Sequence, residues 1–588
     1  MKQESAATKN IMTDIFREML FIQIMAVITA TIGSVVDGII IGNFLGREAM
    51  AAFSIATPFF VFMSCFSNMV GNGAQSLGGN QLGKGDRDAL NGTFSLTVMI
   101  VCIFGLAVFL VAFVFNVQIA VLLGADEPTI NNVADYIKGL SYGALPIMLN
   151  GPMIRFLQLD KAQKFSFLGV VVMTVTDICG DLLNVFVFKK GMYGMAAATS
   201  VGYIAAVVVL STHFFGKHTE LKFDTVKIKM KELKDIIVIG LPTAVGQICT
   251  VLKTVCLNRI FLGLAGTLFV AAYAGQNTIS TLLISVSLGF GMTTLLICSV
   301  LVGEEDRTSL VRTLKDSLKL SVLINAVIAL LVIIGADFLA SLFGKGDLET
   351  RTISARILRI YAVSLPIGII NLNLQNFFQS LKKTMLVNVI CILSNFGLVV
   401  LFALILPVIA GKDSVWFLFP LSQIVTLLLI VLISIVHNRG IPKSFEAFLM
   451  LDDDFGVSED NRLDITINNV DMVVGVSEEI IAFCHDHGID GRRSFFSGLA
   501  IEEMAGNIVK HGFEKKKNNL IEIRVAYKDD TVRIRIRDNC KGFNPMDYLN
   551  KPDDEDITHN IGIRLVSKTA RIFQYQSTFK LNILTVEM

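Results

Sequence analysis

The chain has 588 residues, of which 53% are hydrophobic and 17% charged, and its mean hydropathy is +0.63. Soluble chains carry about 25% charged residues, so this composition excludes an ordinary soluble enzyme and indicates a membrane protein. A formal net charge of +1 argues against binding to nucleic acid through bulk electrostatics. The nine cysteines occur singly, without the paired spacing of a zinc site or a disulfide framework.

Apolar runs follow one another from Met19 to about residue 440 and are separated by short polar breaks. A helix needs about 20 mainly apolar residues to cross a bilayer. Twelve runs are predicted to do so, at 17–40, 51–78, 91–115, 133–157, 166–188, 192–215, 236–262, 268–301, 317–340, 355–378, 385–409 and 414–438. Most basic residues of the breaks then fall on one side, which the positive-inside rule makes the cytoplasm. We therefore expect a multi-pass protein of the plasma membrane whose N-terminus and C-terminal part are cytoplasmic.

An internal repeat relates the two halves of the apolar region. The matching positions, each pair 220 residues apart, are Gly71 and Gly291, Gly83 and Gly303, Asp86 and Asp306, Gly124 and Gly344, and Pro146 and Pro366. Chance similarity would not keep one register across six helices, so the pattern predicts homologous six-helix halves, 1–216 and 236–440, joined by a cytoplasmic linker, 217–235. Because six is even, the halves are parallel repeats related by an axis along the membrane normal.

The composition changes after His437. Residues 441–462 contain a proline and three consecutive aspartates, which indicates a solvated linker. Beyond it, alternation at 520–527 and 531–537 predicts two strands, and residues 470–485 and 494–509 have the pattern of amphipathic helices. Residues 463–588 are therefore expected to form a soluble α+β domain.

Few acidic residues lie inside the apolar runs, and they are candidates for function because charge in a bilayer is costly. Asp37 and Asp181 lie at similar depths if both helices enter from the cytoplasm, so they could face each other. Asp177 lies one turn before Asp181, and two like charges in a low dielectric need a proton or a metal ion. The alternative is that one or more of these acids caps a kink or faces a water-filled vestibule.

These residues resemble the multidrug and toxic compound extrusion (MATE) family over residues 11–440. The resemblance rests on the twelve-helix duplication, on Val36-Asp37-Gly38-Ile39-Ile40-Ile41-Gly42, on Gly83-Lys84-Gly85-Asp86, and on Asp181 followed by Gly191-Met192-Tyr193-Gly194-Met195-Ala196-Ala197-Ala198-Thr199. It implies an antiporter coupled to H⁺ or Na⁺ that exports small organic compounds or drugs. It also implies that Asp37, Asp181 and Thr199 line a cation site in the N-terminal half.

Asp177 departs from this family, which usually has Asn there, and it adds a charge to the predicted site. At the equivalent positions of the second half, Leu257 and Leu401 replace the acids, so ion coupling is expected in one half only.

Three basic residues also lie in the runs. Lys253 in the seventh run would repel organic cations unless it is neutral, paired with an acid or directed to an interface. Arg155 and Arg259 lie near helix ends and are expected to snorkel.

Three motifs of the C-terminal domain occur in an informative order. Glu503 and Asn507 lie one turn apart on an expected helix, Asp538-Asn539-Cys540-Lys541-Gly542 follows a strand, and Asn560-Ile561-Gly562 opens a helix. Together they resemble the GHKL (Bergerat-like) ATPase fold over residues 463–588, most closely the serine kinases that act as anti-sigma factors.

The resemblance implies that the domain binds Mg²⁺-ATP. Asn507 would hold Mg²⁺, Glu503 would act as general base or position the acceptor, and Asp538 would accept a hydrogen bond from the adenine amino group. Gly542 and Gly562 would let the backbone approach the nucleotide. Cys540 and Asn560 replace glycines that are frequent in this family, so binding is expected more than catalysis, and the alternative is an inactive remnant that docks a partner.

The sequence therefore predicts an all-α polytopic membrane protein with a C-terminal α+β domain. Its expected function is ion-coupled export of a small organic substrate, with an ATP-binding domain that regulates transport or acts on a partner resembling an anti-sigma antagonist. One alternative is a flippase for lipid-linked oligosaccharides. Another is a membrane-anchored sensor or serine kinase without transport.

Overall fold

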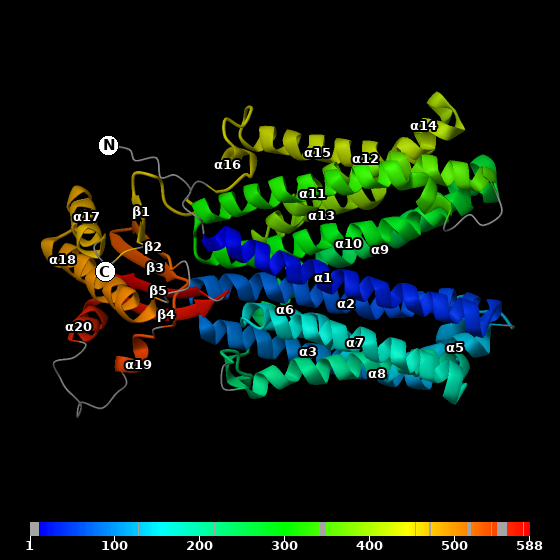
Figure 1. Cartoon of the computed structure of the whole chain (residues 1–588), viewed down its shortest axis with the longest axis horizontal. Helices are drawn as coiled ribbons and strands as arrows, with labels where there is room; N and C mark the ends of the chain where they lie inside the picture. The colour runs from blue at the N-terminus through cyan, green and yellow to red at the C-terminus, as the bar shows by residue number, and fades with distance from the viewer. Residues whose placement is uncertain are drawn as a thin grey trace. The chain divides into compact units, whose positions relative to one another are not determined.

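Figure 1 shows the computed structural model of the chain, which describes residues 11–588 apart from 128, 217–218, 342–347, 453, 468, 470–471, 514–518, 543, 550–560 and 580. The chain divides into two units. Most of residues 16–451 form the membrane unit, and residues 452–588 form most of the second, the tail domain. Each unit is described by itself.

Helices make up the membrane unit. The first half contains α1 (Ile11–Ile40), α2 (Arg47–Lys84), α3 (Arg87–Val114), α4 (Asn116–Leu122), α5 (Ile130–Ser141), α6 (Ala144–Leu159), α7 (Gln163–Leu183) and α8 (Gly191–Thr212). The second contains α9 (Lys231–Ala265), α10 (Thr267–Gly303), α11 (Arg307–Ser341), α12 (Leu348–Ser380), α13 (Thr384–Ile392), α14 (Leu398–Ala410) and α15 (Leu418–His437). Three π-helical turns, η1 (Ile41–Leu45), η2 (Asn184–Phe188) and η5 (Leu393–Gly397), continue α1, α7 and α13.

Among the described residues, eleven helices are long and apolar enough to cross a membrane, whereas the sequence predicted twelve. The difference is the fourth predicted run, 133–157, which forms two shorter helices, α5 and α6, with a break at Tyr142 and Gly143. A Cβ on Gly143 would lie 2.6 Å from the Ser200 hydroxyl oxygen of α8, so α8 packs directly against the break. The equivalent helix of the second half, α12, is continuous.

The 220-residue repeat is visible in the backbone as well as in the sequence. Equivalent turns between helices have positive φ angles in both halves, at Gly46 (88°) and Gly266 (64°), Gly85 (77°) and Glu305 (54°), and Gly191 (57°) and Gly411 (82°). The two halves therefore share the turns that join their helices as well as the helices themselves.

The equivalent helices α2 and α10 cross backbone to backbone. A Cβ on Gly79 would lie 2.1 Å from the Ser299 hydroxyl oxygen, and a Cβ on Gly83 would lie 2.1 Å from the Val300 carbonyl oxygen. Gly79 and Ser299 are repeat partners, as are Gly83 and Gly303, so this contact lies on the pseudo-twofold axis. Close helix packing of this kind needs small residues.

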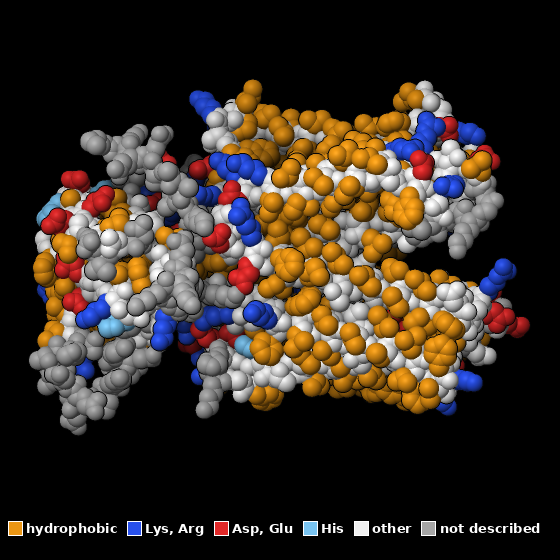
Figure 2. Space-filling view, in the orientation of Figure 1, with side chains coloured by type: hydrophobic (Ala, Val, Ile, Leu, Met, Phe, Trp, Pro, Cys, Tyr) orange, Lys and Arg blue, Asp and Glu red, His pale blue; other side chains and the backbone are white. Residues whose placement is uncertain are grey.

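At the other end of α2 and α10 the halves separate. A Cβ on Gly46 or Gly266, at the turns that precede these helices, would meet nothing within 4 Å. Figure 2 shows an opening between the two groups of helices at this end. The membrane unit is therefore closed where Gly83 and Gly303 meet, which we call the closed end, and open near Gly46 and Gly266, which we call the open end.

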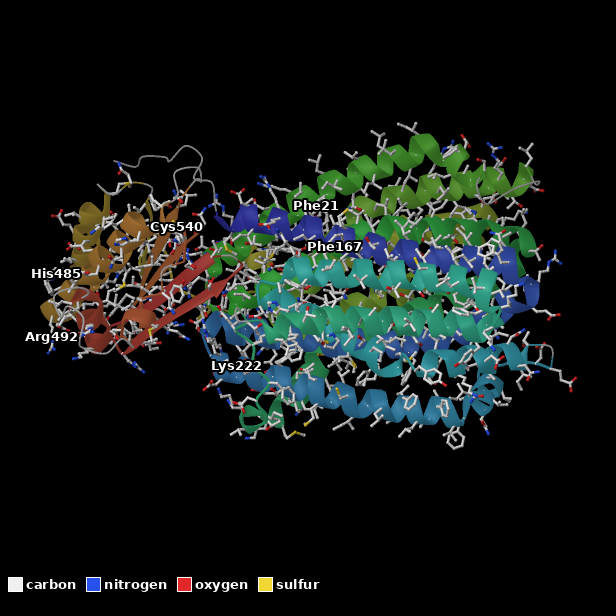
Figure 3. All side chains as sticks on the ribbon, turned by 60° about the horizontal axis from the view of Figure 1, so that its bottom comes forward. Phe21, Phe167, Lys222, His485, Arg492 and Cys540 are labelled. Atoms are coloured by element: carbon white, nitrogen blue, oxygen red, sulfur yellow. The ribbon has the colours of Figure 1, made fainter. Side chains whose placement is uncertain are left out.

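The inter-repeat linker, predicted over 217–235, lies against α3 of the first half. The Lys222 backbone N–H (Lys222 is labelled in Figure 3) donates to Asn91 Oδ1 at 2.9 Å, and the Asp224 N–H donates to Ser95 Oγ at 2.8 Å. These bonds fasten the described part of the linker to the closed end.

The segment after α15 also folds back on the membrane unit. Its short helix α16 (Phe445–Phe448) is followed by Leu449 and Met450, which are 0% and 4% exposed. Asn438 Nδ2 donates to the Ala447 carbonyl at 2.9 Å. The first part of the linker predicted over 441–462 is therefore a buried anchor because its apolar residues pack on the second half.

The tail domain has one antiparallel sheet in the order β1-β2-β3-β5-β4. Its strands are β1 (Arg462–Ile467), β2 (Ile521–Lys528), β3 (Thr531–Asp538), β4 (Ile572–Thr578) and β5 (Leu581–Glu587), and its helices are α17 (Met472–Asp486), α18 (Gly491–Asn507), α19 (Met546–Leu549) and α20 (Ile561–Thr569). Figure 1 shows α17, α18 and α20 on one face of the sheet. Alternate residues of β2, Ile521, Ile523 and Val525, face the same core as Ile480 and Ile501 of those helices.

Candidate functional site

Three carboxylates meet inside the first half of the membrane unit. Asp37 comes from α1, and Asp177 and Asp181 come from α7. One oxygen of each lies within 4.8 Å of the others. Asp177 is 8% exposed and Asp181 is 1% exposed. The structure thus brings together the three acids to which the sequence pointed.

Four of the six oxygens of these carboxylates lack a hydrogen-bond donor among the described residues. Neither oxygen of Asp181 has a hydrogen-bond partner among the described residues, and the same holds for Oδ1 of Asp37 and of Asp177. The Thr199 hydroxyl of α8 donates to the Met195 carbonyl at 3.4 Å and lies close enough to Asp177 to interact with it electrostatically. Because carboxylate oxygens cannot donate, the approach of Asp37 to Asp181 becomes a hydrogen bond only when one of them holds a proton. Orphaned buried oxygens at this spacing fit a shared proton or a hard cation.

Two tyrosines that the sequence analysis missed lie near the acids. Tyr136 of α5 and Tyr203 of α8 are close enough to interact electrostatically with Asp37 and Asp177. Tyr136 is 6% exposed and packs edge-on against Phe53, with ring centroids 5.6 Å apart. A tyrosine in an otherwise apolar run was the only sequence signal for either residue.

Glycines bring the three helices of the cluster close together. A Cβ on each of them would lie near a neighbouring helix: Gly33 at 3.1 Å from Thr174 Cγ2, Gly180 at 2.7 Å from Ala198 Cβ, and Gly202 at 2.9 Å from the Met173 carbonyl oxygen and 3.3 Å from Asp177 Cβ. The approach of α1, α7 and α8 around the acids therefore depends on residues that have no side chain.

Two π-helical turns follow the acids closely. η1 begins four residues after Asp37, and η2 begins three residues after Asp181. Within η2, Asn184 Oδ1 accepts the Lys190 backbone N–H at 3.0 Å, and Asn184 Nδ2 donates to the Gly191 carbonyl at 2.9 Å. Such turns are rare and often occur at functional sites. No sequence pattern predicted them.

The second half has no comparable acid cluster among its described residues. Leu257, the counterpart of Asp37, is 0% exposed in an apolar cluster with Phe261 and Trp416, whose rings are 4.8 Å apart. Leu401, the counterpart of Asp181, is 46% exposed. Apolar packing therefore replaces the carboxylate at Leu257.

Arg155 does not snorkel, contrary to the sequence prediction. It is 4% exposed, and its guanidinium donates to Asn72 Oδ1 at 2.6 Å, to Asn68 Oδ1 at 3.0 Å and to the Gly151 carbonyl at 3.0 Å. The prediction failed because an arginine near a helix end points back along its helix, where amide oxygens of α2 satisfy it here. Asn72 Nδ2 also donates to Thr243 Oγ1 of α9 at 2.9 Å, which links the network to the other half.

In the tail domain, the first and third predicted motifs are adjacent. Glu503 lies in the last turns of α18, and a Cβ on Gly562 would lie 2.0 Å from Glu503 Cδ, so the start of α20 rests on this carboxylate. Asn507 ends α18 and is partly exposed. Asn560 lies outside the described residues.

The second motif is held by hydrogen bonds. Asp538 at the end of β3 is 3% exposed, and its Oδ1 accepts the Cys540 N–H at 2.9 Å and Asn582 Nδ2 at 2.8 Å. Cys540 (labelled in Figure 3) is buried, and the next residue, Lys541, donates its N–H to the Gly512 carbonyl at 3.0 Å. The loop of the second motif is therefore tied to the turn that follows α18.

Asn582 and Tyr575 complete this network and were missed from the sequence. Asn582 of β5 stands opposite Asp538 in the sheet register, and the Tyr575 hydroxyl of β4 donates to Asn582 Oδ1 at 2.9 Å. A Cβ on Gly542 would lie 3.5 Å from Asn582 Oδ1 and 3.6 Å from the Tyr575 hydroxyl. Only the strand pairing, which the sequence did not predict for β4 and β5, could have indicated these residues.

Comparison with known proteins gives a consistent result for both units. Residues 23–183 and 242–405 match the family model described as MatE, and residues 468–588 match the one described as histidine kinase-like ATPase domain. The probable multidrug resistance protein YoeA of Bacillus subtilis is 26% identical over 340 residues, which are 56% of this chain and 73% of that protein. The multidrug export protein MepA of Staphylococcus aureus (strain MRSA252) is 26% identical over 266 residues, 44% of this chain and 58% of MepA.

Solved structures show the same fold. A multidrug resistance MATE family transporter of the MOP superfamily in an outward-facing conformation matches with a TM-score of 0.67 at 19% identity, over 72% of this chain and 97% of that one. A mutant of the Vibrio cholerae MATE transporter VcmN matches with a TM-score of 0.67 at 18% identity, over 74% and 98%. Since the MatE model covers more than half of the chain, the chain belongs to the MATE family of multidrug efflux transporters, multi-pass proteins of the membrane, and it carries a histidine-kinase-like ATPase domain at its C-terminal end.

Proposed function

We propose that the chain is an antiporter that couples the entry of H⁺ or Na⁺ to the export of small organic compounds across the plasma membrane, with its N-terminus and tail domain in the cytoplasm. The observation that supports this proposal most is the cluster of Asp37, Asp177 and Asp181, four of whose oxygens are buried without a hydrogen-bond partner among the described residues. An ion that binds this cluster more tightly in one conformation shifts the population toward that conformation.

α1 provides a physical link from the cluster to the other half. Thr31 Oγ1 lies 2.9 Å from Ser285 Oγ of α10, and a Cβ on Gly289 of α10 would lie 2.6 Å from Ile24 Cγ1. A proton or Na⁺ between α1 and α7 moves Asp37 relative to α7, and with it the face of α1 that packs on α10. The ion thereby biases the contact between the halves.

The first test measures gradient-driven export in proteoliposomes under separate H⁺ and Na⁺ gradients. Asp37→Asn or Asp181→Asn should abolish it, because Asn keeps the volume and loses the exchangeable charge. Asp177→Asn should have a smaller effect, since two acids remain to share a proton. Asp135→Asn, on the exposed face of α5, is the matched control and should export like the wild type.

Export that survives both Asp37→Asn and Asp181→Asn would place the coupling site elsewhere. An absence of flux under either gradient, in protein that is folded and inserted, would favour a sensor without transport.

We also propose that the tail domain binds Mg²⁺-ATP and uses it to regulate transport or to act on a protein partner resembling an anti-sigma antagonist. The network that holds Asp538 supports this proposal, because it fixes a buried carboxylate at a strand end, close in sequence to Gly542. Asn507 would supply an oxygen ligand for Mg²⁺, which takes few ligands from protein. Glu503 would act as the base or position the acceptor. When bound, Mg²⁺ would neutralise part of the negative charge on the phosphates of ATP.

The second test titrates the full-length protein with Mg²⁺-ATP by calorimetry. Asn507→Ala and Asp538→Asn should each weaken binding at least tenfold, through loss of the metal ligand and of the adenine contact. Asp486→Asn, at the exposed end of α17, is the control and should bind like the wild type. If the wild type shows no affinity for the nucleotide, the domain is a docking module instead.

A further inference from the structure

Lys253 lies deep in the second half. It stands twelve residues before the end of α9 at Ala265 and 22 residues after its start at Lys231. At about 1.5 Å per residue, the nearer end is about 18 Å away, which is beyond the reach of a lysine side chain. Snorkelling to the end of α9 is therefore excluded.

The face of α9 that carries Lys253 packs inside the second half. Gly246 is two turns earlier on this face, and a Cβ there would lie 2.8 Å from Cys391 Sγ of α13. Cys249 and Leu257, one turn to either side of Lys253, are 6% and 0% exposed. Lys253 itself is only partly buried.

Pairing with an acid, the second explanation, is excluded as well. Among the described residues Lys253 has no ion pair and no hydrogen bond to any side chain or carbonyl. Two acids at the open end of the second half, Asp337 and Asp413, are paired with Arg359 at 2.7 Å and Arg356 at 3.4 Å instead.

The repeat shows what is unusual about this position. Lys253 is equivalent to Gly33, which lies one turn before Asp37 and packs on Thr174 of α7. The first half thus places three carboxylates at the depth where the second half places a single ammonium. The π turn η5 in the second half is equivalent to the α-helical turn that ends at Asp177.

We propose that Lys253 binds the carboxylate of the transported compound, so that the chain exports amphiphilic anions or zwitterions in preference to simple organic cations. An ammonium group without a partner inside a membrane protein is costly, and a residue that bears this cost is expected to have a functional partner. The described residues supply none, so we keep the lysine charged and assign its partner to the substrate. This inference rests on the export function proposed above and specifies its substrate class.

The test compares two dyes that differ in one group. Rhodamine 110 has a free carboxylate, and rhodamine 123 is its methyl ester and is a cation. Export of both is measured with full-length protein in proteoliposomes, for the wild type, Lys253→Met, Lys253→Arg and the control Lys319→Met, which alters an exposed lysine of α11.

Lys253→Met should raise the KM for rhodamine 110 at least tenfold and change the KM for rhodamine 123 less than twofold, because methionine keeps the length and loses the charge. Lys253→Arg should retain most of the rhodamine 110 export, since arginine keeps the charge. Lys319→Met should match the wild type for both dyes. Unchanged export of rhodamine 123 by Lys253→Met also shows that this variant is folded.

Equal losses for both dyes in Lys253→Met would overturn the inference, because a packing defect does not distinguish a carboxylate from its ester. The inference would also be overturned if the wild type exported only rhodamine 123, or if Lys253→Met exported both dyes normally. If Lys253→Met instead blocked only the transfer of a fluorescent anionic phospholipid, the ligand would be a lipid headgroup, and the assignment to a soluble compound would fail. Failure of the wild type to export either dye under any gradient counts against the export function itself.

Discussion

At the scale of single residues, the acid cluster depends on a glycine as much as on its carboxylates. A Cβ on Gly202 would lie 2.9 Å from the Met173 carbonyl and 3.3 Å from Asp177 Cβ. Gly202→Ala should therefore push α8 away from α7, lower the free energy of unfolding by about 1–3 kcal/mol and reduce gradient-driven export several-fold. Thermal unfolding and flux of the same preparation measure both effects.

Gly263→Ala is the matched control for this prediction. Gly263 is also in a helix, but a Cβ there would meet nothing within 4 Å. Gly263→Ala should therefore keep the export activity and the thermal stability of the wild type. If the two variants behave alike, the contact between α7 and α8 does not shape the site.

The sequence could identify the acids but not their surroundings. Asp37, Asp177 and Asp181 stand out because a carboxylate in an apolar run is costly wherever the run packs. Tyr136 and Gly202 do not stand out, because tyrosine and glycine are ordinary in membrane helices and only tertiary packing puts them beside the acids. Arg155 was misread for the same reason, since its hydrogen-bond acceptors come from another helix.

At the scale of elements, the crossing of α2 and α10 defines the closed end. Gly83→Val should prevent this closure, because even a Cβ would lie 2.1 Å from the Val300 carbonyl. We expect export to fall at least tenfold. We also expect Cys298, which is 0% exposed beside this contact, to become reactive toward a membrane-permeant maleimide. Mass spectrometry of the Cys298 peptide measures the change.

Gly335→Val in α11 is the control, because a Cβ at Gly335 would meet nothing within 4 Å. Normal export and a protected Cys298 are expected there. Protection of Cys298 in Gly83→Val would contradict the assignment of this contact as the closure point.

The sequence predicted a helix correctly where the residues of that helix alone show the length and hydropathy of a membrane span. Most predicted runs match single helices to within a few residues, because length and hydropathy are local properties. The break at Gly143 and the turns η1 and η2 were not predictable, since they arise where a neighbouring helix or a polar side chain competes with the helical hydrogen bonds. The buried anchor at 445–451 was missed because a short apolar stretch beside an acidic run reads as a linker.

At the scale of the whole molecule, the tail domain should not power transport. Removal of residues 452–588 should leave gradient-driven flux within about threefold of the wild type, because the acid cluster and both halves lie in the other unit. The membrane unit has no G-x-x-x-x-G-K-[ST] sequence for ATP, and one ATPase domain lacks the paired arrangement of an ATP-driven pump. Flux in vesicles measures the effect.

A second truncation after Gly440 provides the contrast. This truncation also removes the anchor. The buried side chains of Leu449 and Met450 are then lost, and Asn438 loses its hydrogen bond to the Ala447 carbonyl. This variant should be less thermally stable than the first. If removal of residues 452–588 alone stops flux, the tail domain is more than a regulator.

The anchor at 445–451 has a further consequence for signalling. Only ten residues, 452–461, separate it from β1 of the tail domain, and an extended chain of that length spans at most about 35 Å. A tether this short keeps the tail domain near the membrane unit at an effective concentration in the millimolar range. Any contact between the two units would then need only millimolar affinity to be populated. A reporter built in this way needs no tight interface.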